Sequence, residues 1–327
     1  MDFVQKRDQL AAIIINTLVP LIDNDFVLID LPYYTNIGDI LIWEGEIQFI
    51  QQYITKNKML FSCSIQTFNS SNIDKNTIII LHGGGNFGDI WRGHADFRLK
   101  ILKEFPQNKI IILPQTVYYS NKDTLLSDAA IFNNHKNLFI CARDKYSYQI
   151  LKEYFTESGN TIYLLPDMAF CISQDKIKKY KSEQRNKTLF LKRTDNELNY
   201  TINYSKYITE KKYDICDWPS MGKENKKLIS YFFLRCLLWA NRRIPVVFRV
   251  LTDIYASTFF KPAMIKTGVK FISKYEKIYT TRLHTAILCC LLEKPCVLFN
   301  NSYGKNSSFY ETWLKDVDGM ELLPHAI

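Results

Sequence analysis

The sequence predicts an α/β protein made of two Rossmann-like halves that meet at a cleft. Short apolar segments, typical of strands, alternate with helix-like segments from Phe26 onward. Strands without polar alternation are typical of a parallel sheet that helices cover on both faces. A polar, lysine-rich link at 174–187 then precedes a second series of apolar segments. A chain of 327 residues, 47% of them hydrophobic, is large enough for two packed cores.

The first half is expected to begin with an amphipathic helix, because the apolar side chains between Leu10 and Leu21 fall on one helical face. Strands and helices then alternate. We expect strands at 27–31, 77–81, 109–113, 137–142 and 161–165, and helices after Asn36, after Asn86, near 123–132 and at 144–154.

The second half repeats this pattern less regularly. Its expected elements are 188–192, 245–250, 269–273, 277–281 and 295–299, with a helix at 285–292. For the stretch 231–251, the alternative is two helices broken near Pro245. The predicted domains are residues 1–173 and 188–327, each Rossmann-like, and the C-terminal segment can pack back on the first domain.

The charge of the chain indicates an anionic partner. The formal charge is +9 and the pI is about 9.0, which favours an anionic substrate, a membrane surface or nucleic acid. The lysines of 176–192 and 206–227 are dispersed and show no nucleic-acid motif, so we interpret them as a solvated face and expect no nucleic-acid partner.

The apolar stretch 231–251 contains four arginines, which argue against a membrane-spanning helix. Ordinary packing on the domain is one interpretation, and peripheral contact with an anionic membrane is the other. Acids at Asp2 and Asp8 argue against a signal peptide. Eight cysteines without a Cys-x-x-Cys pair are typical of a reduced protein. The expected location is the cytoplasm, with any peripheral contact at the inner face of the membrane.

Ligands of open α/β sheets bind where strands end and helices begin, and two such junctions contain conspicuous glycines. At the first, Asn36 can cap a helix that contains Gly38 and Asp39, which taken alone is an ordinary helix start. At the second, Gly83, Gly84, Gly85 and Asn86 follow the strand 77–81. Three consecutive glycines would expose backbone N–H groups at a helix N-terminus, so we expect an anion-binding loop there.

The same glycines also match the dinucleotide-binding pattern Gly-x-Gly-x-x-Gly at 83–88. The next strand, however, leads into Pro114 and Gln115 and offers no carboxylate for a ribose. The match is therefore weak evidence for a nucleotide.

Two further junctions contain arginine. Arg143 follows the strand 137–142 and can bind a phosphate or carboxylate, although a surface ion pair is the alternative. Arg282, Leu283 and His284 follow the strand that begins at Lys277. A histidine beside a fixed cation at a strand-to-helix junction favours catalysis over a structural role. No His, Cys or carboxylate cluster has the spacing of metal ligands, so we expect no metal.

The order and spacing of these motifs resemble the polysaccharide pyruvyl transferase family over most of the chain. The resemblance is weakest between Ser173 and Lys274. It is carried by Asn36–Asp39, His82–Asp89, Pro114–Thr116, Ala142–Asp144, Pro166–Asp167, Arg282–His284 and Tyr303–Lys305. The resemblance implies a GT-B-like fold and transfer of pyruvate from phosphoenolpyruvate to a sugar as a ketal, with no cofactor.

The resemblance also implies residue roles. Arg143 and Arg282 would bind the phosphate and carboxylate of phosphoenolpyruvate, and His284 would be the acid/base residue, since imidazole titrates near neutral pH. Leu283 would be a spacer whose backbone assists. The remaining donor-site candidates are Gly83, Gly84, Gly85, Asn86 and Arg193, and the acceptor-site candidates are Asn36, Asp39, Asp89 and Lys305.

The hypothesis is a pyruvyl transferase of cell-surface polysaccharide assembly, with a free or lipid-linked glycan as acceptor. A GT-B glycosyltransferase that uses a nucleotide sugar is one alternative. A non-catalytic glycan-binding protein is the other.

Overall fold

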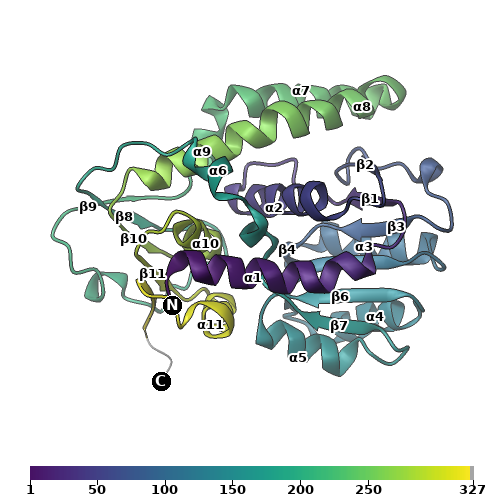
Figure 1. Cartoon of the computed structure of the whole chain (residues 1–327), viewed down its shortest axis with the longest axis horizontal. Coiled ribbons are helices and arrows are strands. Elements are labelled where there is room, and N and C mark those ends of the chain that lie inside the picture. Colours follow the sequence, from purple (N-terminus) through teal and green to yellow (C-terminus); the bar gives the residue numbers. More distant parts are fainter. Residues whose placement is uncertain (325–327) are drawn as a thin grey trace.

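The computed structural model describes residues 1–324, which form two parallel sheets covered by helices (Figure 1). The first sheet has seven strands in the order β2-β1-β3-β5-β6-β7, and β4 pairs with β5. Its strands are β1 (Phe26–Ile29), β2 (Met59–Ser62), β3 (Ile78–Leu81), β4 (Gly84–Gly88), β5 (Ile110–Tyr118), β6 (Leu138–Ala142) and β7 (Thr161–Leu164).

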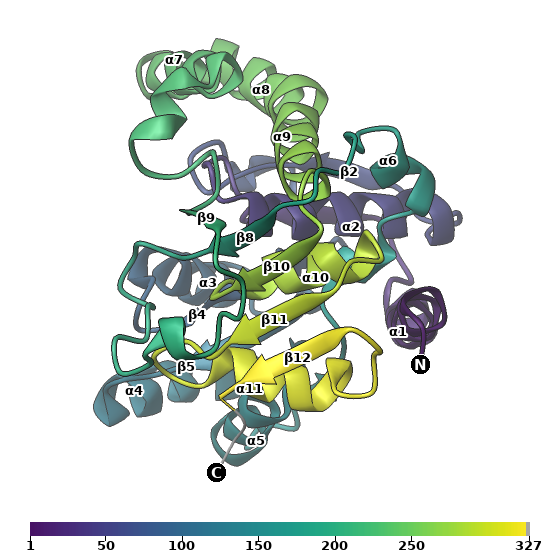
Figure 2. The same cartoon turned by 90° about the vertical axis from the view of Figure 1, so that its left-hand side faces the viewer.

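The second sheet has the order β12-β11-β10-β8-β9, visible in Figure 2. Its register pairs Ile278 with Leu189 on one side and with Cys296 on the other. Its strands are β8 (Thr188–Leu191), β9 (Tyr213–Cys216), β10 (Lys277–Thr280), β11 (Cys296–Phe299) and β12 (Met320–Leu323). The mixed α/β fold with parallel sheets predicted from the sequence is confirmed.

The strand orders have a direct consequence for ligand binding. In each sheet the chain first forms an inner strand, β1 or β8, and then the neighbouring edge strand, β2 or β9. The following strands are added on the other side of the inner strand. The strand order therefore reverses between β1 and β3 and between β8 and β10. Parallel sheets bind ligands at such reversal points, beyond the carboxyl ends of the strands. The fold therefore offers two neighbouring reversal points for one site.

Helices cover both sheets. They are α1 (Phe3–Leu18), α2 (Ile37–Tyr53), α3 (Arg92–Glu104), α4 (Lys122–Asn133), α5 (Lys145–Tyr154), α6 (Gln174–Lys178), α7 (Ile229–Arg243), α8 (Pro245–Tyr255), α9 (Lys261–Ser273), α10 (Leu283–Leu291) and α11 (Lys305–Phe309). Short 3₁₀ or π segments are η1 (Val19–Leu21), η2 (Ser70–Asn72), η3 (Met168–Cys171), η4 (Tyr204–Lys206), η5 (Gly222–Lys227), η6 (Ala256–Phe260) and η7 (Tyr310–Leu314).

One hydrophobic core connects the two sheets. α2 packs against α9 and α10, and α1 packs against α10 and η3, so α1 lies across both sheets in Figure 1. The buried cluster includes Leu28 and Ile111 of the first sheet and Leu189 and Leu298 of the second. The strands divide at the predicted link, but the two-domain division itself stays a prediction.

The C-terminal segment contacts elements of the first sheet. Ser308 Oγ donates to Asp144 Oδ1 at 2.9 Å, and Trp313 Nε1 donates to the carbonyl oxygen of Arg143 at 2.7 Å. These bonds attach α11 and η7 to the start of α5.

The glycine-rich motif was assigned to the wrong element. Gly84–Gly88 forms strand β4, and the next helix, α3, begins only at Arg92. Gly88 has φ 128°, and a Cβ there would lie 1.8 Å from the carbonyl oxygen of Tyr118 on β5. A run of glycines permits this close pairing of two backbones. The prediction of an N–H cradle at a helix N-terminus is therefore wrong.

Two segments of the second half are also corrected. Residues 245–250 and 269–273, expected in the second Rossmann-like series beside its strands, lie in helices α8 and α9. Pro245 occupies the first turn of α8, where its missing N–H costs nothing. The alternative of two helices broken near Pro245 is confirmed. The sheet instead uses β9 and β12 at its edges, and β9 is only partly buried, which weakens its sequence signal.

Candidate active site

A cavity of about 370 Å³ opens at the carboxyl ends of the strands of both sheets. Segments after β1, β3, β6, β8, β9, β10 and β11 contribute to its walls, including both reversal points. The lining residues are Tyr34, Thr35, Asn36, Asp39, Gly85, Asn86, Trp91, His94, Arg143, Arg193, Asp195, Glu197, Trp218, Met221, Arg282, Leu283, His284 and Lys305. The structure thus brings most of the predicted site residues together.

Arg143 supplies an unused hydrogen-bond donor in this cavity. Its Nε donates to Thr116 Oγ1 at 2.8 Å and its Nη1 to Asp167 Oδ2 at 2.7 Å. Its Nη2 is buried and has no partner. A Cβ on Gly85 would lie 3.0 Å from this Nη2 and 3.3 Å from Lys305 Nζ. Gly85 therefore leaves space where two cationic groups converge, as an anionic oxygen requires.

His284 is held by a buried carboxylate. Its Nε2 lies 3.2 Å from Asp167 Oδ2 and 3.4 Å from Arg143 Nη1. Asp167 can accept a hydrogen bond from a protonated Nε2, and Nδ1 is then the ring nitrogen that can take up or release a proton. On the Nδ1 side of the ring lies Gly38, the second residue of α2. Burial would raise the pKa of Asp167, but His284 and Arg143 hold the pKa of that carboxyl well below its ordinary range.

Asp167→Asn is expected to destabilise the fold in a pH-dependent way. Because the pKa of Asp167 is lower in the folded state, its stabilising contribution is complete above the unfolded pKa near 4 and is lost as pH falls toward the folded value. At pH 7 the substitution should lower the free energy of unfolding by about 3 kcal/mol, since it leaves Arg143 without its buried partner. Urea denaturation at pH 7 measures this penalty, most of which should persist at pH 3.5 because that pH is still well above the folded pKa.

The exposed carboxylate Asp96, which pairs with Arg92 on the surface, supplies the matched control. Asp96→Asn should change stability little at any pH. A penalty for Asp167→Asn at pH 7 as small as that of Asp96→Asn would contradict the assigned pairing.

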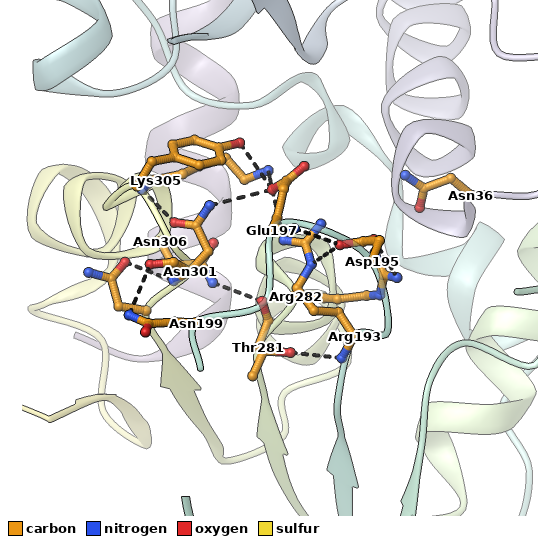
Figure 3. A network of polar contacts seen from close by, with 12 residues as sticks. Asn36, Arg193, Asp195, Glu197, Asn199, Thr281, Arg282, Asn301, Lys305 and Asn306 are labelled. Carbon is orange, nitrogen blue, oxygen red and sulfur yellow. Dashed lines mark hydrogen bonds and ion pairs between the residues drawn. The ribbon is translucent and has the colours of Figure 1, made fainter. Parts of the chain in front are cut away.

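Arg282 is fixed by two carboxylates. Its Nε lies 2.5 Å from Asp217 Oδ1, and its Nη2 lies 2.7 Å from Asp217 Oδ2 and 3.0 Å from Asp195 Oδ2. Figure 3 shows Arg282 and Arg193 next to their shared partner Asp195. These ion pairs fix the orientation of the guanidinium and offset part of its positive charge. The group can therefore hold an anion in a defined position as well as attract it.

Arg193 and Lys305 share Glu197. Arg193 Nη1 and Lys305 Nζ each lie 2.8 Å from Glu197 Oε2, and Figure 3 shows this carboxylate on the side of Lys305. Burial would raise the pKa of Glu197, but the two cations lower it. Burial in turn lowers the pKa of Lys305 against the attraction of Glu197. Lys305, an acceptor-site candidate, therefore lies on the same side of the cavity as Arg143.

The other predicted residues divide into two groups. Asn36 caps α2 through a 3.1 Å bond from the Gly38 N–H and donates to Asp39 at 2.8 Å, and both side chains line the cavity. Gly83 and Gly84 do not line it. Asp89 also lies outside, where it accepts bonds from Ser120 and from the Asn121 N–H before α4.

Several cavity residues were missed by the sequence analysis. His94 Nδ1 lies 2.6 Å from Asp30 Oδ1, and the ring lines the cavity beside Trp91, which is 47% exposed. Asp30 has φ 71°, which directs its buried carboxylate toward His94 from the end of β1. This pair is suited to a sugar, because the aromatic ring can pack on the apolar face of a sugar and the oriented histidine can bond to its hydroxyl groups. The sequence signal that could have identified His94 is its position in the first turn of the helix that follows the glycine-rich strand β4.

Within residues 1–324, no group of three or more His, Cys, Asp or Glu side chains has the geometry of a metal site.

The fold and this cavity define a parallel α/β protein with a site suited to an anionic ligand and to proton transfer. The chain belongs to the polysaccharide pyruvyl transferase family, whose sequence model matches residues 36–303. It is 33% identical to EpsO of Bacillus subtilis (strain 168), a candidate pyruvyl transferase, over 93% of this chain and 89% of that protein. It is 25% identical to Pyruvyl transferase 1 of Schizosaccharomyces pombe, over 92% of this chain and 73% of the relative.

A solved structure agrees in fold. A protein of uncharacterised function from Klebsiella pneumoniae superposes with a TM-score of 0.64 and 18% identity, covering 96% of this chain and 98% of the other. Family membership and relatives together indicate a polysaccharide pyruvyl transferase.

Proposed function

We propose that this protein transfers the pyruvyl group of phosphoenolpyruvate to two hydroxyls of a sugar, as a cyclic ketal, during assembly of a cell-surface polysaccharide. The observation that carries the proposal is the buried, unpartnered Nη2 of Arg143, which converges with Lys305 over Gly85. A buried cationic donor without a partner is costly unless a ligand supplies an acceptor. Phosphoenolpyruvate, with about three negative charges, supplies several.

The proposed chemistry begins with proton transfer. His284 gives a proton to the methylene carbon of phosphoenolpyruvate, and Asp167 stabilises the imidazolium form before this transfer and again when a hydroxyl proton restores it. Protonation leaves a cationic carbon next to the phosphate oxygen, and the oxygen of a sugar hydroxyl bonds to it. The C–O bond to phosphate then breaks, and a second hydroxyl closes the ring. One hydroxyl proton leaves with the phosphate, and the other restores His284.

The arginines have separate tasks in this scheme. Arg143 and Lys305 hold one anionic end of phosphoenolpyruvate over Gly85. Arg282, oriented by Asp217, stabilises the charge that develops on the departing phosphate. Arg193, Leu283 and Asn86 complete the donor side, and phosphoenolpyruvate is a co-substrate in a reaction without a cofactor.

The acceptor is assigned to the opposite side of the cavity. Trp91 provides a ring for the apolar face of a sugar, and His94 with its Asp30 partner can accept a hydroxyl proton. Asn36 and Asp39 would orient the hydroxyl pair. We further propose that the two sheets are the cores of two Rossmann-like domains in a GT-B-like arrangement, and that the protein works in the cytoplasm on a free or lipid-linked glycan.

Phosphoenolpyruvate is expected to raise the melting temperature of the protein. At about 100 times its dissociation constant, a ligand adds about 2.7 kcal/mol of stability, which corresponds to several degrees for a chain of this size. Nucleotide sugars at equal concentration should leave the melting temperature unchanged. Differential scanning fluorimetry measures both.

Inorganic phosphate and pyruvate, tested separately, are the matched ligand controls and should give smaller shifts than phosphoenolpyruvate. A shift with nucleotide sugars alone would favour a glycosyltransferase. Release of phosphate from phosphoenolpyruvate with a panel of sugars separates an enzyme from a glycan-binding protein, because only the enzyme turns over.

A further inference from the structure

Helices α7 and α8 expose apolar side chains on their outer faces. Eleven of the twenty exposed large hydrophobic side chains in residues 1–324 belong to the segment 229–259. They are Ile229, Phe232, Phe233, Trp239, Ile244, Val246, Val247, Val250, Leu251, Ile254 and Phe259. We call this set the hairpin surface. Exposed apolar clusters of this kind mark interaction sites on proteins.

The spacing shows that the exposure is systematic. On α7, Phe232 and Phe233 lie three and four residues after Ile229, and Trp239 lies two helical turns after Phe232. On α8, the exposed apolar positions recur three and four residues apart from Val246, which is 90% exposed. An ordinary surface helix turns its apolar stripe inward. Here the buried positions are Leu234, Asn241 and Thr252, and the two polar side chains bond to backbone carbonyl oxygens. The two helices therefore expose more large apolar side chains than they bury completely.

The hairpin surface is also cationic. Arg235, Arg242, Arg243 and Arg249 lie among the apolar side chains, and none of them forms an ion pair within the described residues 1–324. Arg243 lies over the ring of Trp239, 3.6 Å from its centroid. The only acid between residues 229 and 255 is Asp253.

Asp253 faces the protein, where it anchors the hairpin. Its Oδ1 accepts bonds from Tyr33 at 2.8 Å and from Thr67 at 2.6 Å. Asp253 therefore does not neutralise the arginines of the outer face. Burial raises the pKa of Asp253, and Arg249 on the same helix opposes that rise. Figures 1 and 2 both place α7 and α8 at the outer edge of the molecule, beyond α2.

The hairpin is continuous with the wall of the cavity. Trp218 and Met221 line the cavity, and the chain then passes through η5 to the start of α7. Ser220 Oγ donates to the carbonyl oxygen of Thr35, another lining residue, at 2.6 Å. The hairpin is therefore joined to the cavity wall by one short segment of the chain.

We propose that the hairpin surface docks the protein on an anionic phospholipid bilayer. None of the helices in residues 1–324 is long and apolar enough to cross a membrane. Apolar side chains with arginines between them suit a helix that lies flat at the membrane surface. The apolar side chains would then enter the acyl-chain region, and the arginines would contact the lipid phosphates. A second copy of the chain fits less well, because self-pairing would bring unpaired arginines against arginines. Docking does not depend on the proposed reaction, whereas a lipid-linked acceptor at the neighbouring cavity does.

Vesicle flotation of the full chain tests the proposal without substrate. The protein should float with vesicles in which about a third of the lipid is phosphatidylglycerol, and about tenfold less with phosphatidylcholine alone. The double variant Val246→Glu/Val250→Glu should reduce the bound fraction about tenfold, because it places acids on the apolar stripe. Arg242→Ala/Arg243→Ala should reduce it similarly and weaken the dependence on salt.

Matched substitutions elsewhere keep the test specific. Leu126→Glu on α4 changes an exposed apolar side chain outside the hairpin and should leave flotation unchanged. Trp239→Phe should remove a vesicle-induced blue shift of tryptophan emission while preserving flotation. Melting temperatures measured without any ligand show whether each variant is folded.

Three results would overturn the proposal. One is the absence of wild-type flotation with either vesicle, and another is flotation that neither hairpin variant reduces. The third is a dimer, detected by sedimentation, that Val246→Glu/Val250→Glu dissociates while vesicles are not bound. Failure of pyruvyl transfer with intact flotation would contradict the proposed function alone.

Discussion

Replacement of His284 by glutamine is expected to lower the rate of pyruvyl transfer by about 10³-fold, the usual contribution of a positioned acid/base group. Glutamine can still donate an amide N–H to Asp167, which replaces the 3.2 Å contact of Nε2, but it cannot carry a proton to the methylene carbon. The substitution therefore removes the chemistry while it satisfies the buried carboxylate.

Phosphate release with a saturating sugar acceptor measures this effect. The stabilisation by phosphoenolpyruvate should persist, because Arg143 and Lys305 remain in place. His135→Gln is the matched control, since His135 is a buried histidine that bonds to the carbonyl oxygen of Phe105 and lies outside the cavity. Turnover per folded molecule should be unchanged in that variant. Unchanged turnover in His284→Gln would contradict the assigned role.

The sequence located the site where strand ends and local motifs coincide. Arg143 follows β6 and Arg282 follows β10, and both positions line the cavity because carboxyl ends of parallel strands meet at one edge. Asn36 was predictable as a helix cap for a similar reason, since its interaction spans only two residues.

The carboxylates that orient these groups were not predictable from the same patterns. Asp217 is 65 residues from Arg282 in the chain, and Asp167 is 117 residues from His284. Such pairs depend on the order of the strands, which local periodicity does not contain. The sequence alone therefore predicted Arg282 as a free cation, whereas in the structure Asp217 is its partner.

The errors in the fold have one physical origin. An apolar, β-branched run lies in helix α8 and a glycine-rich run forms strand β4, and at both places the expected element was wrong. For 245–250, apolar residues that would suit a buried strand instead lie on an outward helical stripe. For 84–88, close pairing with β5 outweighs the weak strand propensity of glycine. Tertiary contacts decided both elements.

Gly38→Ala is expected to lower turnover by about 100-fold, the cost of displacing a catalytic group by roughly 1 Å. The added Cβ would lie 2.5 Å from Nδ1, 2.8 Å from Cγ and 2.9 Å from Cβ of His284. These atoms include the root of the side chain, so a change of rotamer alone cannot relieve the contact. Either the ring moves away from Asp167, or α2 moves away from α10.

Gly93→Ala provides the matched control, because Gly93 lies in the first turn of α3 and a Cβ there meets nothing within 4 Å. This variant should retain full turnover and gain slightly in stability, by up to about 1 kcal/mol, since alanine favours a helix over glycine. Steady-state phosphate release and urea denaturation on both variants separate the two effects. Gly38→Ala should lower kcat far more than it raises KM, because Arg143 and Lys305 still hold phosphoenolpyruvate. A Gly38→Ala enzyme with normal kcat would show that the Nδ1 side of His284 takes no part in the reaction. Proton transfer would then have to be assigned to another nitrogen in the cavity, and His94 Nε2 is the first candidate to test.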